Sequence, residues 1–207
     1  MKKIILIFAT IAMILALASA AYAAEAYTAT QDDEVRAVIE KLKSEYIRDD
    51  MTDFEKEMQI IQWMVANIDY DFNNYLNNTI PQESYSAYGA LVKHAAVCDG
   101  YSDAFKRLGE ACRLQIEKIS GEGYGYNGWG RHAWNQILLD GEWYNVDVTW
   151  EDPVPSNKYG FGHLRNDYIN CADINFPEHR TSDTNRHTCM ANKYGHEAVA
   201  EYLKKEK

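Results

Sequence analysis

Residues 131–150 read RHAWNQILLDGEWYNVDVTW, and this stretch decides how the rest of the chain is arranged. Asp140 and Gly141 lie at its centre, and this dipeptide is typical of a type I′ turn because both central positions need a positive φ. We therefore predict two antiparallel strands in which Leu139 faces Glu142, so that the numbers of cross-strand partners sum to 281 (139 and 142). Apolar residues fall on both faces of the hairpin, which is typical of a sheet that is covered on both sides.

The predicted register places an imidazole beside a carboxylate. In that register His132 faces Thr149 and Trp134 faces Asp147. His132 and Asp147 then lie on one face as diagonal neighbours, with Cα atoms roughly 7–8 Å apart, which the two side chains can span. A slip of one residue would send them to opposite faces.

A cysteine upstream could complete a reactive group of three. Residues 97–102 read VCDGYS, and Tyr101, Phe105 and Leu108 continue at helical spacing. Cys98 is therefore predicted at or just before a helix N-terminus, where unpaired N–H groups favour a thiolate and can stabilise an oxyanion. A thiol nucleophile needs a base, and the base needs an orienting group, which His132 and Asp147 could supply. The alternative is that Cys98 is a small buried apolar residue.

A segment rich in glycine and aromatic residues, 121–130, comes directly before the hairpin. A strand is predicted over residues 114–119, and we interpret the segment after it as a flexible loop. It does not match a phosphate-binding loop, because it lacks the Gly-Lys-Ser/Thr ending and no helix follows. It forms either the wall or lid of a cleft or a long hairpin connection without a ligand.

Two amphipathic helices are predicted nearer the N-terminus, over residues 31–47 and from residues 52–55 to Ile68. Their apolar residues recur at the three- and four-residue spacing of a helix face. Thr52 and Glu55 form a capping box at the start of the second helix. We interpret both apolar stripes as core.

Three short motifs in order resemble the transglutaminase-like superfamily, the papain-related fold shared by transglutaminases, peptide N-glycanases and many exported bacterial proteins. They are VCDGY at 97–101, HAWN at 132–135 and WYNVDVTW at 143–150. The segment YSAYGAL at 85–91 also resembles the lead-in of bacterial members. The resemblance covers roughly residues 55–153.

The resemblance implies an α+β fold with N-terminal helices, in which the nucleophile helix packs on an antiparallel sheet and the base and acid lie on adjacent strands. It implies that Cys98 is the nucleophile, His132 the general base and acid, and Asp147 the orienting carboxylate. Two departures lie outside these three residues. The segment 94–96 stands where members often carry glycine, and Ser102 stands where alanine is usual.

A thiolate and imidazolium pair implies acyl transfer through a thioester. Water as the second nucleophile gives a cysteine peptidase or amidase, whereas an amine gives a protein-glutamine transglutaminase. We favour hydrolysis of a peptide or amide bond, because the chain is small and shows no evident amine-binding module. The competing class is a catalytically silent binding module, since a fold does not establish an activity. A protein or peptide, including cell-wall peptide, is the expected substrate.

The N-terminus predicts export. Lys2 and Lys3 precede an apolar run from Ile4 to about Leu17 and two small-residue cleavage sites, so residues 1–23 read as a signal peptide, the alternative being a retained anchor. One domain is predicted over 24–207, with a core at about 55–153, a loop-rich part at 154–207 and a secreted or extracytoplasmic location. The formal net charge of −10, or −12 without the two lysines, argues against nucleic acid and anionic lipid as partners.

The four cysteines do not predict a metal site. Cys98, Cys112, Cys171 and Cys189 form no CxxC pair, and structural zinc usually recruits closely spaced pairs. We therefore expect no metal and no cofactor. Cys171 and Cys189, both in the loop-rich part, are the disulfide candidates of an exported protein, and Cys112 is then a buried free thiol.

Overall fold

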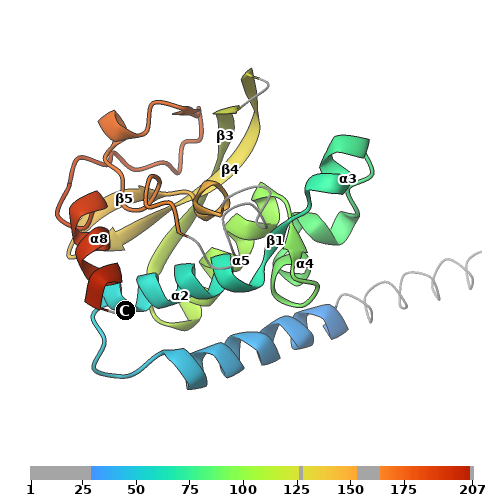
Figure 1. Ribbon diagram of the computed structural model, residues 1–207, viewed down its shortest axis with the longest axis horizontal. Coiled ribbons are helices and arrows are strands. Elements are labelled where there is room, and N and C mark those ends of the chain that lie inside the picture. Colours follow the sequence, from blue (N-terminus) through green and yellow to red (C-terminus); the bar gives the residue numbers. More distant parts are fainter. Residues whose placement is uncertain (1–28, 126–127, 153–163, 206–207) are drawn as a thin grey trace, which may run out of the picture.

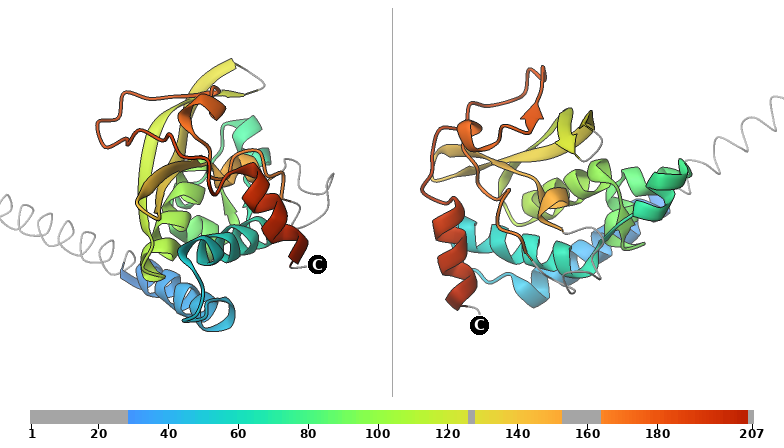
Figure 2. Two further views of the ribbon diagram at one scale, coloured as in Figure 1. Left: turned by 90° about the vertical axis from the view of Figure 1, so that its left-hand side faces the viewer. Right: turned by 45° about the horizontal axis from the view of Figure 1, so that its top comes forward.

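The computed structural model describes residues 29–125, 128–152 and 164–205. The predicted signal peptide at 1–23 lies outside the described residues. Among those that are described, no helix is both long enough and apolar enough to cross a membrane. Helices lie on one side of an antiparallel sheet (Figures 1 and 2), which confirms the predicted α+β class. Loops of the C-terminal segment lie on the other side, and the last helix returns to the helical side, where Tyr202 contacts Phe54 and Gln59.

The elements follow one another from a helix at residues 29–46 to a closing helix at the C-terminus. In order, they are α2 (Asp53–Asn67), β1 (Asp69–Tyr70), α3 (Phe72–Asn77), η1 (Gln82–Tyr85), α4 (Ala87–Leu91), β2 (Ala95–Ala96), α5 (Cys98–Ala111), β3 (Gln115–Gly125), β4 (Gly128–Leu139), β5 (Glu142–Val146), α6 (Val148–Glu151), η2 (Asp173–Asn175), β6 (His179–Arg180) and α8 (His196–Lys205). The main sheet has the order β5-β4-β3-β6, and β1 pairs with β2 in parallel.

Helix α5 is the central helix of the core. Tyr101, Phe105 and Leu108 are fully buried on it, as their spacing predicts. It packs against α2 on one side and against β3 and β4 on the other. Gly109 allows the close approach to the sheet, because a Cβ there would lie 2.2 Å from Cδ1 of Ile116. The position of α5 therefore fixes where its first residue, Cys98, meets the sheet.

The capping box of α2 is present as predicted. The Thr52 N–H donates to Glu55 Oε2 at 2.7 Å, and the Glu55 N–H donates to Thr52 Oγ1 at 3.2 Å. These two bonds satisfy backbone donors that the first turn of a helix leaves unpaired. They define where the second helix begins.

The predicted hairpin register is confirmed for five pairs. Leu139 faces Glu142 and Asn135 faces Val146, and the turn residues Asp140 and Gly141 have φ values of 50° and 85°. The prediction that the second strand runs on to residue 150 is wrong, because it ends at Val146. The predicted pairs of residues 132 with 149 and 134 with 147 therefore do not form.

The strand ends where a helix begins. Asp147 is the N-cap of α6, and its Oδ1 accepts the Trp150 N–H at 3.1 Å. Aspartate is a preferred N-cap because its carboxylate satisfies a free N–H of the first turn. The carboxylate thus leaves the sheet but stays beside it.

The prediction of a flexible loop over residues 121–130 is wrong. Residues 121–125 continue β3 and 128–130 begin β4, so the segment is the far end of a long hairpin, while 126–127 lie outside the described residues. The glycines make room for neighbours. A Cβ on Gly121 would lie 2.4 Å from the Arg180 carbonyl oxygen, and one on Gly123 would lie 2.8 Å from Trp150.

The C-terminal segment is fixed to the sheet through polar groups. Asn145 and Cys171 exchange two backbone hydrogen bonds of 2.9 Å, and the Gln136 side chain bonds both backbone groups of His187. Glu151 accepts the backbone N–H groups of three consecutive residues, 166–168. The two backbone bonds between Asn145 and Cys171 form a single β-bridge, and the segment ends in α8.

Cys171 and Cys189 are both buried free thiols, so the expected disulfide is not present. Cys171 donates to the Asp167 carbonyl at 3.4 Å, and the Gln136 Nε2 donates to Cys189 Sγ at 3.2 Å. Each sulfur therefore takes part in a separate hydrogen bond. Cys112 is a buried free thiol, as expected.

One buried carboxyl gives the fold a testable pH dependence. Glu57 of α2 is fully buried, one of its oxygens accepts the Asn170 Nδ2–H at 2.9 Å, and burial raises its pKa to about 8. The folded state thus holds a proton that the unfolded state has lost above its ordinary pKa of about 4.5. The contribution of this proton to the free energy of unfolding is fully present below pH 4.5 and is lost as the pH rises towards 8.

We predict that Glu57→Gln stabilises the protein at pH 8 and changes little at pH 5, because the amide keeps the acceptor and never ionises. The gain in the free energy of unfolding at pH 8 should be on the order of a few kcal/mol. Urea unfolding of both proteins at the two pH values measures it. If the two proteins differed in free energy of unfolding by the same amount at pH 5 and at pH 8, the raised pKa of Glu57 would be contradicted.

Candidate active site

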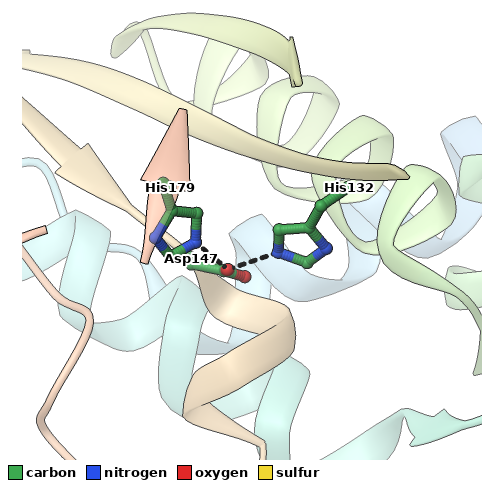
Figure 3. Close-up of side chains that lie close together, drawn as sticks. All are labelled: His132, Asp147 and His179. Carbon is green, nitrogen blue, oxygen red and sulfur yellow. Dashed lines mark hydrogen bonds and ion pairs between the residues drawn. The ribbon is translucent and has the colours of Figure 1, made fainter. Parts of the chain in front are cut away.

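Four segments that lie far apart in the sequence meet at one end of the sheet. Cys98 begins α5, His132 lies on β4, Asp147 follows β5, and His179 begins β6. Figure 3 shows both imidazole rings pointing at the Asp147 carboxylate. The structure therefore brings together the three residues that the sequence singles out and adds a fourth.

Cys98 occupies the first position of α5, as predicted. Val97 before it is extended, with φ −100° and ψ −179°, and caps the helix without a side-chain bond. The Cys98 side chain is half-buried, whereas the other three cysteines are buried. A thiolate at this position faces the positive end of the helix dipole and the free N–H groups of the first turn.

His132 bonds the Asp147 carboxylate through Nε2, and the Cys98 side chain is a second partner of its ring. Its Nε2 lies 2.6 Å from Asp147 Oδ2, and its ring stacks on Trp150 with centroids 4.8 Å apart. Burial acts to lower the pKa of His132, but the Asp147 charge and hydrogen bond, together with the Cys98 side chain, raise it above its ordinary value. The imidazolium form of His132 is therefore favoured, chiefly by the Asp147 carboxylate.

Asp147 is a fully buried carboxylate. Burial alone would raise its pKa, but the His132 charge and the hydrogen bonds from both imidazoles lower it below its ordinary range. Three donors converge on it, since Oδ1 accepts the Trp150 N–H and Oδ2 accepts from both rings. A buried charge is tolerated only when it is paired and hydrogen-bonded in this way.

His179 is the site residue that sequence reasoning missed. Its Nε2 lies 2.8 Å from Asp147 Oδ2, and its side chain is 1 % exposed. The ring stacks on Phe176 at 3.6 Å and lies 4.4 Å from Trp150 and 5.0 Å from Trp134. Its residue number is 32 beyond that of Asp147 and its strand is only two residues long, so no periodicity or spacing points to it.

The three groups His132, Asp147 and His179 also have the composition of a metal site. Their ligand atoms all lie within 4.8 Å of one another. However, the two nitrogen-to-oxygen separations are 2.6 and 2.8 Å. Ligands at about 2.0–2.1 Å from a tetrahedral zinc stand about 3.3 Å apart, so these separations are those of hydrogen bonds.

A tyrosine hydroxyl lies within electrostatic reach of the thiol. Tyr70 on β1 pairs with Ala96 on β2, two residues before Cys98, and the Asp71 N–H donates to the Ala96 carbonyl at 2.9 Å. Burial, followed by the Cys98 charge, raises the pKa of Tyr70 above its ordinary value. The phenol therefore stays protonated and can act as a donor.

Comparison with known proteins places the site in a family. The chain matches the family model described as Transglutaminase-like superfamily over residues 40–148, which is 109 of its 207 residues. The kyphoscoliosis peptidases of Mus musculus and Homo sapiens are 27% and 28% identical over 124 and 120 residues, or 56% and 54% of this chain. The chain spans 18% of the length of each of these relatives.

A solved structure titled as that of a TGase superposes with a TM-score of 0.46 at 18% identity, and the match covers 59% of this chain and 32% of that one. Together with the family match, the mixed helix and sheet architecture confirms the predicted transglutaminase-like core. The roles of the individual site residues stay predictions.

Gly123 offers a test of how tightly the site is packed. A Cβ there would lie 2.8 Å from Trp150 Cζ2 and 3.1 Å from His132 Cδ2. We predict that Gly123→Ala displaces these rings and slows alkylation of Cys98 on the order of tenfold to a hundredfold, because small displacements of a catalytic group are costly. The rate of iodoacetamide labelling at pH 7 measures this effect.

Gly125→Ala is the matched control, because a Cβ at this position on the same strand has no atom of the described residues within 4 Å. Its labelling rate should equal that of the unmodified protein, and circular dichroism should show that both variants are folded. Equal rates for Gly123→Ala and Gly125→Ala would contradict the packing account.

Proposed function

The chain belongs to the transglutaminase-like superfamily, and from this premise we propose that it is a thiol-dependent acyl transferase. Cys98 is the nucleophile, His132 the general base and acid, and Asp147 the orienting carboxylate. The observation that carries the proposal is the 2.6 Å bond between His132 Nε2 and Asp147 Oδ2 on a ring whose other partner is Cys98. A base fixed in this way is what an activated thiol requires.

The proposed reaction has two halves. The Cys98 thiolate attacks the substrate carbonyl carbon, and the oxyanion that forms accepts hydrogen bonds from the Cys98 backbone N–H and the Tyr70 hydroxyl. The His132 imidazolium gives its proton to the leaving amine as the carbon–nitrogen bond breaks, which leaves a thioester. His132 then removes a proton from the second nucleophile, and the thiolate leaves as the thioester is cleaved.

We propose water as that second nucleophile, so that a peptide or amide bond is hydrolysed. The two kyphoscoliosis relatives carry the name peptidase, although the chain spans less than a fifth of either. Trp129, which could have shielded a thioester from water, is 40 % exposed and packs on Tyr124 and Arg180 at the end of the hairpin instead. The packing of Trp129 at the end of the hairpin supports hydrolysis, whereas protein-glutamine transglutamination would need water to be kept out.

The proposed substrate is a protein or a peptide outside the cytoplasm, including cell-wall peptide. The signal-peptide pattern at residues 1–23 supports export, and the net charge of −10 supports the expectation that nucleic acid is not a partner. The bond that this proposal has Cys98 attack is a carboxamide, which all of these substrates contain.

Removal of the base tests whether the thiol is activated. We predict that His132→Ala slows iodoacetamide labelling of Cys98 at pH 7 by at least about tenfold, because only the thiolate reacts quickly. His187→Ala is the control, because that ring stacks on Trp143 at 3.8 Å, outside the bonded group at Asp147. If the unmodified protein and His132→Ala label equally slowly, the chain is a silent binding module.

Asp147→Asn tests the orienting carboxylate. We predict that it preserves the fold but slows formation of the Cys98 thioester by several orders of magnitude, because an amide disfavours the productive tautomer of His132. Mass spectrometry of Cys98 after exposure to peptide and cell-wall extracts measures the trapped acyl group. Undiminished thioester formation would remove Asp147 from the mechanism.

The same experiment identifies the acceptor. With a primary amine added to the extract, a hydrolase releases the free acid, whereas a transglutaminase releases the amine adduct. Adduct as the main product would replace hydrolysis by transamidation and leave the triad unchanged.

A further inference from the structure

One oxygen of Asp147 serves two imidazoles. Oδ2 lies 2.6 Å from Nε2 of His132 and 2.8 Å from Nε2 of His179. The second ring comes from β6, outside residues 40–148 that match the family model. A Cys-His-Asp triad needs only one imidazole on the Asp147 carboxylate. The second imidazole on Oδ2 therefore calls for a physical explanation.

The hydrogen bonds fix the tautomer of His179. An ionised carboxylate only accepts, so each ring must carry a proton on the nitrogen that faces Asp147. For His179 this is Nε2, and Figure 3 shows its other nitrogen on the side away from Asp147. That nitrogen, Nδ1, is buried and has no hydrogen-bond partner among the residues that the structure describes. The described contacts are therefore those of a neutral imidazole with one donated proton.

The surroundings of His179 keep it neutral and in place. Phe176 stacks on its ring, and Trp134 and Trp150 enclose it. Burial lowers the pKa of His179 below its ordinary value, despite the opposing effect of the Asp147 bond. The titratable and charged groups around it are Asp147, His132, Glu178 and Tyr168, and Asp173, Arg180 and Arg186 line a cavity of about 260 Å³ that it borders.

The position of His179 follows from the strand that carries it. β6 pairs with β3 through Glu122 with Arg180 and Gly123 with His179. The Tyr124 N–H donates to the Glu178 carbonyl at 2.8 Å, which extends the contact by one residue. The backbone of the glycine-rich strand thus holds His179 against Asp147.

We propose that His179 is a positioning residue for the Cys98–His132 pair: as a neutral donor it holds the Asp147 carboxylate in the orientation that His132 needs. The inference rests on the proposed thiol chemistry. The two oxygens of Asp147 accept different hydrogen bonds: Oδ1 accepts the Trp150 N–H at the start of α6, and Oδ2 accepts the Nε2–H groups of both imidazoles. The Trp150 N–H holds Oδ1, and His179 holds Oδ2 independently of His132, so the carboxylate does not rotate away from the base.

The same geometry gives a pH signature that a merely structural histidine lacks. When His179 gains a second proton, two cationic rings share one oxygen, and the charge on His179 opposes the imidazolium form of His132. The Cys98–His132 ion pair then loses stability. As the pH is lowered, the rate of Cys98 labelling should therefore fall because of two protonations. One proton binds to the Cys98–His132 ion pair and the other to His179.

Two variants separate these effects in the full chain. His179→Phe keeps a ring in the aromatic enclosure but removes the donor, and we expect it to slow iodoacetamide labelling of Cys98 at pH 7 by about tenfold. His179→Gln keeps an N–H donor that cannot gain a charge. We expect it to restore most of the rate at pH 7 and to shift the acidic fall to lower pH with a shallower slope. His187→Ala, in the same C-terminal segment, is the control that should match the unmodified protein.

The outcomes distinguish this inference from the proposed function. If the unmodified protein labels no faster than His132→Ala, the proposed function fails. If the unmodified protein is reactive but both His179 variants follow its rate at every pH, His179 does not position Asp147 and the inference is overturned. Should His179→Phe fail to fold, the pH profile of His179→Gln alone decides, since an unchanged acidic limb overturns the inference.

Discussion

The buried charge of Asp147 is the constraint on which the rest of the site depends. A fully buried carboxylate costs several kcal/mol unless donors surround it. Here three donors do so, from the backbone of α6 and from the rings of His132 and His179. Each donor comes from a different element, so the ionised carboxylate also joins those elements to one another.

The sheet and the central helix bring these groups together. The Asp140–Gly141 turn sets the register of β4 against β5, which places Asp147 at the end of the strand beside the one that carries His132. The burial of α5 between α2 and the sheet fixes Cys98 at the same end. Glycines in β3 allow Trp150 and β6 to approach, so the absence of side chains at Gly121 and Gly123 is as important as the side chains themselves.

Local rules of sequence were sufficient for much of this arrangement. The turn residues predicted the register, the helical spacing after Cys98 predicted α5, and Thr52 with Glu55 predicted the start of α2. The sequence mispredicts the end of β5 because the β-branched and aromatic residues 148–150 favour a strand, whereas Asp147 bonds the Trp150 N–H and starts a helix there. Residues 121–125 resemble a loop by composition, and the docking of β6 makes them a strand.

The contributions of the C-terminal segment could not be predicted, because they arise from contacts between distant residues. The segment that carries His179 is held near Asp147 by the pairing of Asn145 with Cys171 and by the bonds of Glu151 to residues 166–168. The same docking gives Cys189 a hydrogen-bond partner in Gln136 and Cys171 one in Asp167, where cysteine count alone suggested a disulfide. A single sequence carries no spacing rule for such contacts.

The central claim is that Asp147 receives a proton-bearing Nε2 from each of two imidazoles. Nitrogen-15 NMR of histidine-labelled protein at pH 7 tests it directly, because the chemical shifts of Nδ1 and Nε2 report which nitrogen carries the proton. We expect His179 as a neutral ring protonated on Nε2 and His132 with a proton on Nε2 facing Asp147. A neutral His179 protonated on Nδ1, with a bare Nε2 towards the carboxylate, would contradict the account.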